Sequence, residues 1–251
     1  MVNKLQIKNQ KVMEEIKSRL VSLRLSGMAH QWQTLAELRR TEELSLPDGM
    51  QLLLQAEVDK RLENRNARLI KNAGFRYRAS FEEVNAAAVR GIDKTLLDRL
   101  ATGEYIKNGQ AILITGATGC GKSHLATAFG HRACRQGYTV CYQNMQKLLT
   151  NLKMARLEGS IIKLFDRWAK TQLMIIDDFG LTTLQGQQQN DFLEIIEDRH
   201  GRHATIITSQ LPVSNWFDVI GDAIIADAVL DRLVHTAHRF ELKGESLRKN
   251  G

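Results

Sequence analysis

The sequence contains only three cysteines, and no long apolar run. Cys120, Cys134 and Cys141 are never spaced as CxxC, so they indicate neither a disulfide framework nor a zinc site. No apolar stretch approaches the roughly 20 residues of a membrane helix, and the first residues lack the order of a secretory signal. We therefore expect a cytoplasmic protein with no membrane partner.

Charge is distributed unevenly along the chain. The formal net charge is +7, and residues 1–80 carry 15 Lys and Arg against 9 acids, whereas residues 81–251 carry 20 against 19. A basic excess confined to one part of a chain points to an anionic partner, most often nucleic acid. From charge alone, a well-solvated basic surface is an equally good interpretation.

The first third of the sequence has apolar residues at helical spacing, from about residue 10 to residue 72. Pro47, Asp48 and Gly49 interrupt this pattern and predict a break before a helix that runs from Met50 to about Lys71. We expect an all-helical N-terminal domain.

A mixed basic and aromatic segment follows this helix. Lys71, Arg76 and Arg78 interleave with Phe75 and Tyr77. Such a mixture can contact phosphates and stack on bases, but a connector that packs its aromatic side chains on the next domain would have the same composition. The domain boundary is placed around residues 72–80.

From residue 111 onward, short apolar segments alternate with helical ones, which predicts an α/β fold with a mostly parallel sheet covered by helices on both faces. The N-terminal domain then spans residues 1–75 and the α/β domain spans residues 76–251. The expected strands are 111–115, 139–143, 173–176 and 205–208, and the best-defined helices are 123–136 and 187–199.

A phosphate-binding motif opens the first helix of the α/β region. The segment Gly116-Ala117-Thr118-Gly119-Cys120-Gly121-Lys122-Ser123 matches GxxxxGK[ST], directly after an apolar strand and before a helix that continues with His124. Main-chain amides in such a loop cradle phosphate oxygens, and Lys122 reaches the β- and γ-phosphates. Because the Ser123 hydroxyl can ligate Mg²⁺, the motif predicts ATP and Mg²⁺ as ligands.

Two acids end the third apolar strand, at the sheet edge where open α/β folds bind ligands. Asp177 is expected to hold Mg²⁺, and Asp178 to orient or deprotonate the attacking water. The alternative interpretation of Asp177 and Asp178 is that they are two solvated acids at a strand end. The strand 139–143 lies between the two motif strands in the sequence, and an extra strand separating these motifs is typical of hydrolytic P-loop ATPases.

Polar residues after the fourth strand could reach the same edge. Ser209 and Gln210 could contact the γ-phosphate or the water, or could be ordinary polar residues at a strand end. Arg232 lies late in an apolar helix and could act as an arginine finger on a neighbouring subunit. From the residues alone, a surface salt bridge is the better interpretation of Arg232, and Arg239 is a weaker candidate.

The chain resembles the IstB-type transposition helper ATPases, relatives of the DnaC helicase loader and the DnaA initiator in the AAA+ class. The resemblance covers nearly the whole chain. It rests on five segments, LRLSGMA at 23–29, GATGCGKSHLA at 116–126, LMIIDDFG at 173–180, TSQLP at 208–212 and DRLVHTAHRFELKGESLRK at 231–249.

The resemblance implies a P-loop AAA+ helper protein of a bacterial insertion sequence. Such a protein oligomerises on double-stranded DNA with ATP and stimulates its transposase. The resemblance also implies that Arg232 is an arginine finger, that Ser209 is a sensor residue and that Arg248 could be a second sensor. Contacts with DNA are expected to be mostly to phosphates and largely independent of sequence.

Two other functions remain open. A DnaC-like replicative helicase loader would use its N-terminal helices to grip a helicase rather than DNA. A small-molecule kinase would keep the P-loop but would need an acceptor pocket and no oligomer, and it would leave the second acid and Arg232 without a clear role.

Overall fold

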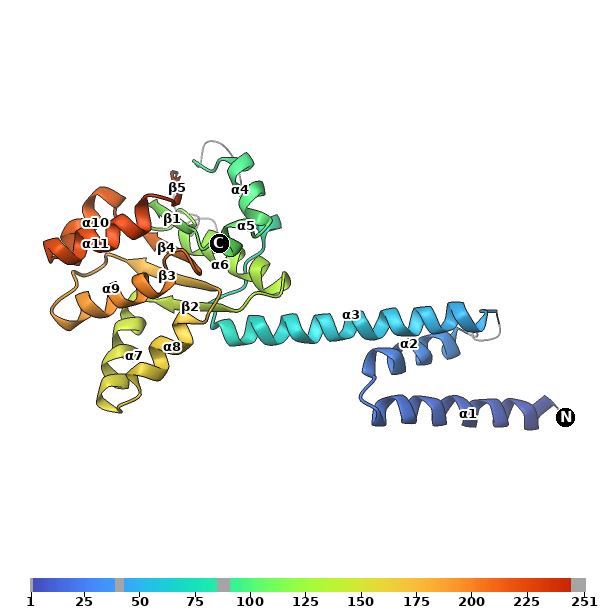
Figure 1. The fold of residues 1–251 in the computed structure, drawn as a ribbon. Coiled ribbons are helices and arrows are strands. Elements are labelled where there is room, and N and C mark those ends of the chain that lie inside the picture. The colour runs from blue at the N-terminus through green and yellow to red at the C-terminus, as the bar shows by residue number, and fades with distance from the viewer. Residues whose placement is uncertain (1, 39–42, 85–90, 245–251) are drawn as a thin grey trace. The chain divides into compact units, whose positions relative to one another are not determined.

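The computed structural model describes residues 2–38, 43–84 and 91–244, with the side chains described from residue 10 onward (Figure 1). The chain divides into two compact units, Met1–Arg68 and Leu69–Gly251. The division falls inside a helix, several residues before the boundary expected at 72–80. Among the described residues, no helix has both the length and the apolar character needed to cross a bilayer.

The N-terminal unit is built from α1 (Val2–Ser22), α2 (Ser26–Glu37) and the first part of α3 (Leu46–Ala73). The helix α2 contacts both of the others. The Trp32 indole donates to the Met13 carbonyl of α1 at 3.0 Å. Met28, Leu35 and Leu53 form a small buried cluster, so this unit has a helical core of its own, as expected.

The approach of α2 to α3 requires a glycine and an acid. A Cβ added to Gly27 would lie 2.3 Å from the Ala56 carbonyl oxygen and 2.6 Å from the Glu57 Cα. The Glu57 carboxylate accepts from the amides of Gly27 at 2.7 Å and Met28 at 3.2 Å. The N-cap residue of α2, Leu25, makes no side-chain capping hydrogen bond. Glu57 of α3 therefore caps the first turn of α2 in its place.

The predicted start of α3 was wrong. Pro47, Asp48 and Gly49 lie in its first turn rather than before it, because proline is tolerated where the first helical amides have no partner. The predicted end is confirmed. The helix stops at Ala73, and Gly74 adopts a φ of +74°, a conformation favourable to glycine after a helix.

The second unit contains a five-stranded parallel sheet with the order β2-β3-β4-β1-β5. The strands are β1 (Ala111–Gly116), β2 (Val140–Asn144), β3 (Leu173–Phe179), β4 (Ala204–Ser209) and β5 (His238–Leu242). The strand that separates β1 from β3 in space is β4. The strand between them in the sequence, β2, lies beyond β3 at the edge.

Helices cover both faces of the sheet, as predicted (Figure 1). Alternate residues of β1 supply the two cores, with Ile112 and Ile114 facing one and Leu113 the other. The first face packs on α4 (Lys94–Ala101), α5 (Glu104–Lys107) and α6 (Lys122–Arg135). The second packs on α7 (Met145–Leu157), α8 (Ile161–Ala169), α9 (Gln187–Arg199), α10 (Trp216–Ile220) and α11 (Ala223–Val234).

Candidate functional site

The predicted phosphate loop connects β1 to α6 at the carboxyl edge of the sheet. Gly116, Gly119 and Gly121 have φ values of +144°, +82° and +99°, which side-chain-bearing residues rarely adopt. A Cβ on Gly116 would lie 2.3 Å from the Leu242 carbonyl oxygen. Gly121 precedes α6 without any side-chain cap from the described residues. The first amides of α6 are therefore open to an anion.

Two polar side chains of this loop have partners within it or beside it. Lys122 is 6% exposed as a residue, and its ammonium donates to the Ala117 carbonyl at 2.8 Å. The Thr118 hydroxyl donates to the Gln210 side-chain oxygen at 2.8 Å, which links the loop to the end of β4. Cys120 is buried, so this member of the motif can offer its main chain to a ligand but not an exposed thiol.

Asp177 is held rigidly near the carboxyl end of β3, which β4 separates from β1. It is 1% exposed, and its carboxylate accepts hydrogen bonds from the Tyr142 hydroxyl of β2 and the Thr208 hydroxyl of β4. Burial and the charge of Asp177 raise the pKa of Tyr142, so the phenol remains a donor. Strands on both sides of β3 thus fix the orientation of this carboxylate.

Asp178 occupies a different environment, one residue further along β3. Its φ is +61°, and the β3–β4 register is irregular between Ile176 and Phe179. The Asn144 amide donates to its carboxylate at 2.9 Å, and its own amide donates to Thr208 at 3.1 Å. The strand continues through both acids instead of ending before them, and the irregularity turns the two carboxylates into different surroundings.

The pKa of Asp178 is raised above the ordinary value of an aspartate. Burial is the main cause, and the negative charge of Asp177 adds to it. Positive charge from Arg76 and Lys122 opposes this shift. A carboxylate with a raised pKa in a phosphate site is suited to accept a proton from water.

The segment after α3 packs on the site rather than standing free. The Phe75 ring stacks on His131 with centroids 4.5 Å apart. The Tyr77 ring is nearly parallel to His124 at 6.5 Å, and the His124 Nε2 lies 3.6 Å from the Glu83 carboxylate. Of the two interpretations of this segment, packing of its aromatic rings on the α/β unit is the one that the structure supports.

Ser209 is buried and already engaged. Its hydroxyl donates to the Phe179 carbonyl at 2.7 Å and accepts from the Leu211 amide at 3.1 Å. It therefore ties the end of β4 to the end of β3. The side chain that reaches the phosphate loop from this strand end is that of Gln210.

Arg232 lies away from the phosphate loop of its own chain. It bonds the Glu197 carboxylate of α9 and donates to the Ala228 carbonyl at 2.7 Å. It also borders a narrow pocket that is lined by Ala111, the first residue of β1, and Thr205, the second residue of β4. This pocket therefore lies at the amino ends of these strands, whereas the phosphate loop lies at the carboxyl end of β1. Any role at ATP would have to be on a neighbouring subunit. The other candidate, Arg248, lies outside the described residues.

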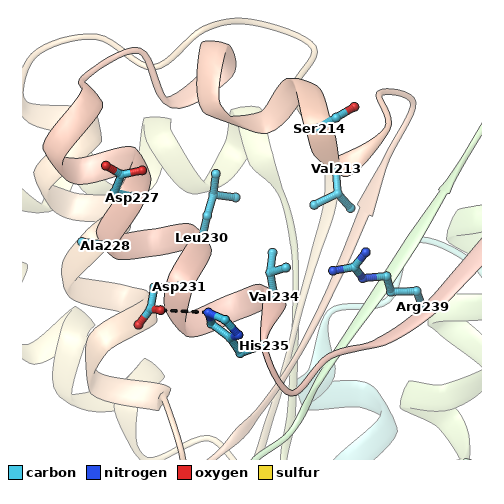
Figure 2. A pocket seen from close by; sticks show the side chains of 9 residues that line it. All are labelled: Val213, Ser214, Asp227, Ala228, Leu230, Asp231, Val234, His235 and Arg239. Atoms are coloured by element: carbon cyan, nitrogen blue, oxygen red, sulfur yellow. Dashed lines mark ion pairs between the residues drawn. The ribbon is translucent and has the colours of Figure 1, made fainter.

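The opposite side of α11 lines a broad concavity of about 840 Å³ (Figure 2). Asp231 and His235 pair across one helical turn at 3.1 Å on its wall, and Arg239 of β5 extends into it. This concavity does not include the phosphate loop. Arg239, and not Arg232, is thus the arginine presented on this side of α11.

The residues at the carboxyl edge suit a nucleoside triphosphate with Mg²⁺. The open amides of α6 and the Lys122 ammonium match phosphate oxygens. Magnesium prefers oxygen ligands, and two oxygen donors lie at the carboxyl edge of the sheet, the Ser123 hydroxyl in the first turn of α6 and the fixed Asp177 carboxylate on β3. Ser123 and Asp177 are therefore the residues able to hold the metal.

Three residues of this site were not identified from the sequence. Tyr142 and Thr208 are the hydrogen-bond donors to Asp177, and Asn144 is the donor to Asp178. Asn144 directly follows the predicted strand 139–143, so its position at the carboxyl edge could have been noticed. Tyr142 and Thr208 lie within strands, where no local pattern separates them from ordinary strand residues.

Residues 18–251 match the family described as IstB-like ATP binding protein. An insertion sequence ATP-binding protein of Sinorhizobium fredii is 44% identical over 232 residues, covering 92% of this chain and 95% of the relative. A second, from the insertion sequence IS1162 of Pseudomonas fluorescens, is 39% identical over 198 residues, covering 78% and 86%.

Solved structures share the fold at low identity. The DnaC helicase loader superposes with a TM-score of 0.53 at 19% identity, covering 69% of this chain and 98% of that chain. The AMPPCP-bound DnaA of Aquifex aeolicus gives 0.55 at 18% identity, covering 68% and 52%. These are AAA+ proteins, so the second unit has the AAA+ P-loop fold.

Proposed function

Because the chain belongs to the IstB-like ATP-binding protein family, we propose that it is a Mg²⁺-dependent ATPase that assembles on duplex DNA and stimulates the transposase of an insertion sequence. The observation that carries the ATPase part is the juxtaposition of two features. Open amides and the buried residue Lys122 begin α6, and two differently held carboxylates lie near the carboxyl end of β3.

Each residue has a role that its contacts favour. The amides of 116–123 and of His124 hold phosphate oxygens, and Lys122 exchanges the Ala117 carbonyl for the β- and γ-phosphates. Ser123 and Asp177 hold Mg²⁺, which would neutralise phosphate charge. Asp178 orients the attacking water and accepts its proton.

The end of β4 contributes through position. Ser209 fixes the strand end by its hydrogen bond to the Phe179 carbonyl, and Gln210 then lies against Thr118 of the phosphate loop. We assign Ser209 the sensor role by way of this link, so that a change at the γ-phosphate displaces Gln210 and the strand that carries it.

Assembly would place an arginine on the neighbouring subunit's nucleotide. Arg232 remains the proposed finger, and to act it must exchange its Glu197 partner for phosphate. Arginine suits this role because its planar fork pairs with phosphate in two contacts. Loss of turnover in the assembled Arg232→Ala variant, with ATP binding retained, would support the assignment, and full turnover would end it.

Duplex DNA as a partner is supported by the charge distribution. Residues 1–80 contain 15 basic and 9 acidic residues, and they precede the strands of the sheet. Lys and Arg release condensed counterions from phosphates, so such an excess favours binding without base contacts. The relatives' association with insertion sequences supports a transposase as the protein partner.

The alternative, a DnaC-like helicase loader, has weaker support. The likeness to the DnaC helicase loader is at 19% identity and shows the fold alone. The insertion sequence relatives reach 44% identity over nearly all of the chain. A pull-down against a transposase and a replicative helicase in parallel separates the two functions.

The direct test is filter binding of a duplex with and without ATP and Mg²⁺. We expect ATP to increase duplex retention and Lys122→Ala to abolish the increase. Retention that is the same with and without nucleotide would contradict the proposed function.

A further inference from the structure

The segment that follows α3 packs on α6 and on Tyr142, the hydrogen-bond partner of Asp177. Phe75 stacks on His131 and lies 6.2 Å from the Tyr142 ring, measured between centroids. A Cβ on Gly130 would lie 2.5 Å from the Phe75 ring, so the ring fills the space left by that glycine. Tyr142 in turn donates to Asp177. Phe75 therefore anchors this segment against the strand end that positions the proposed metal ligand.

Tyr77 anchors the same segment on its other side. Its ring lies parallel to His124, with an angle of 11° between the planes. His124 directly follows Ser123, the second proposed metal ligand, in the first turn of α6. The two anchors thus pack along α6, Tyr77 at its first turn and Phe75 near Gly130 and His131.

Arg76 lies between these anchors. The chain bends at Arg76 and Tyr77, and the Arg76 side chain is exposed. In the described part of the chain, its guanidinium has no hydrogen bond or ion pair. In the chain it stands between Phe75, which packs on the Tyr142 partner of Asp177, and Tyr77, which packs on His124 in the first turn of α6. Arg76 therefore presents an uncommitted cation beside the strand end that carries Asp177 and beside the first turn of α6.

We propose that Arg76 contacts the terminal phosphate of the bound nucleoside triphosphate from the same chain, and so distinguishes the triphosphate from the diphosphate. This inference rests on the proposed ATPase function. A guanidinium suits the task because it stays charged and can pair with two phosphate oxygens at once. The two aromatic anchors limit the conformational freedom that such a contact would otherwise cost.

The position of Arg76 also suggests what the contact is for. The helix α3 ends at Ala73, immediately before the turn at Gly74 and the anchored segment. A residue that holds the γ-phosphate here would release the segment when that phosphate leaves. The state of the nucleotide would then be read at the start of the connection to the N-terminal unit.

The test compares Arg76→Ala with Arg78→Ala, using equilibrium binding of fluorescent ATP and ADP with Mg²⁺. Both arginines are exposed in the same segment, and Arg78 follows the second anchor, Tyr77, whereas Arg76 lies between the two anchors. For Arg76→Ala, we expect ATP affinity to fall about tenfold or more, the effect of one lost charged hydrogen-bonding contact. ADP affinity should change less than about twofold. Arg78→Ala should leave both affinities unchanged, and Arg76→Lys should recover part of the ATP affinity.

The outcomes distinguish this inference from the function on which it rests. If the unaltered chain binds ATP and Arg76→Ala keeps the same preference for ATP over ADP, the role of Arg76 is overturned while the proposed function stands. Equal losses for ATP and ADP would also overturn it. If the unaltered chain binds neither nucleotide, both proposals fail.

Discussion

At the scale of single residues, the two neighbouring acids are made different by their contacts. Asp177 is buried and receives two hydroxyl donors, which fix its orientation as a proposed metal ligand. Asp178 receives one amide donor, and burial beside Asp177 raises its pKa. One carboxylate is thereby suited to hold a cation and the other to exchange a proton.

Lys122→Ala is expected to weaken ATP binding by roughly 100-fold, because a charged contact to phosphate is worth up to about 3 kcal/mol. Titration of the nucleotide by calorimetry measures the loss. Lys107→Ala, which removes an exposed cation at the end of α5, is the matched control and should bind as the unaltered chain does. Unchanged affinity in Lys122→Ala would remove this lysine from the phosphate site.

The pH dependence of turnover should respond to Asn144. Asn144→Asp keeps the oxygen that caps α7 but replaces the donor to Asp178 with a like charge, so the pKa of Asp178 should rise further. Because the base must be ionised, turnover should then be lost at a higher pH as the solution is acidified. Gln143→Glu adds the same charge one residue away and should shift the profile less. Coincident acid limbs in all three proteins would exclude Asp178 as the proton acceptor.

At the scale of elements, the packing of α2 on α3 explains why Ser26, Gly27 and Met28 occur at the start of α2. These residues belong to the segment at 23–29 that carries part of the family resemblance. Gly27 allows the main chains of the two helices to meet, and the Glu57 carboxylate caps α2. Burial raises the pKa of Glu57, but hydrogen bonds from Arg61 and the α2 amides outweigh this effect and hold the pKa below its ordinary value. This stabilisation is present above the unfolded-state pKa and should be lost as the pH falls through the lower folded-state value.

Gly27→Ala should destabilise the N-terminal unit by about 1–3 kcal/mol, because the new methyl group overlaps main-chain atoms that cannot move aside easily. Urea unfolding monitored by fluorescence reports on this unit when Trp168 and Trp216 of the second unit are replaced by phenylalanine, so that Trp32 alone emits. Gly49→Ala is the matched control, since its Cβ would meet nothing within 4 Å among the described residues. If both variants unfold at the same urea concentration, the close helix approach is not needed for stability.

The sequence predicted the elements better than their arrangement. Helix α9 was predicted at 187–199 and is found there, because its periodic pattern is local. The strand β5 was not predicted, since His238–Leu242 is short and mixes polar with apolar residues. The position of β4 between the motif strands depends on pairing between distant segments. For the same reason, Thr208 and Tyr142 could not be recognised as partners of Asp177.

At the scale of the whole molecule, the basic excess extends across the division between the two units. Residues 1–68 carry 12 Lys and Arg against 9 acids, and residues 69–80, at the start of the second unit, add Lys71, Arg76 and Arg78 and no acid. We therefore expect the surface for an anionic partner to include the start of the ATP-binding unit as well as the N-terminal helices. The helix α3 carries the chain from one unit to the other.

Duplex binding should weaken steeply with salt, by several powers of ten between 50 and 200 mM if about six or more phosphates are contacted. The double variant Lys11→Gln and Arg68→Gln should reduce both affinity and salt dependence, because both side chains are exposed in the basic third. Lys147→Gln with Lys163→Gln removes two exposed charges from the second unit and is the control. Equal losses in the two double variants would place DNA binding elsewhere.

The most direct measurement pairs ATP binding with phosphate release, for the unaltered chain and for Asp178→Asn, with Mg²⁺ and duplex present. Both proteins should bind ATP with similar affinity, because the phosphate loop and metal ligands remain. The variant should release phosphate at least about 100-fold more slowly, because the proton acceptor is gone. An unaltered chain that neither binds nor cleaves ATP, or a variant that loses binding along with turnover, would contradict the assignment of the site.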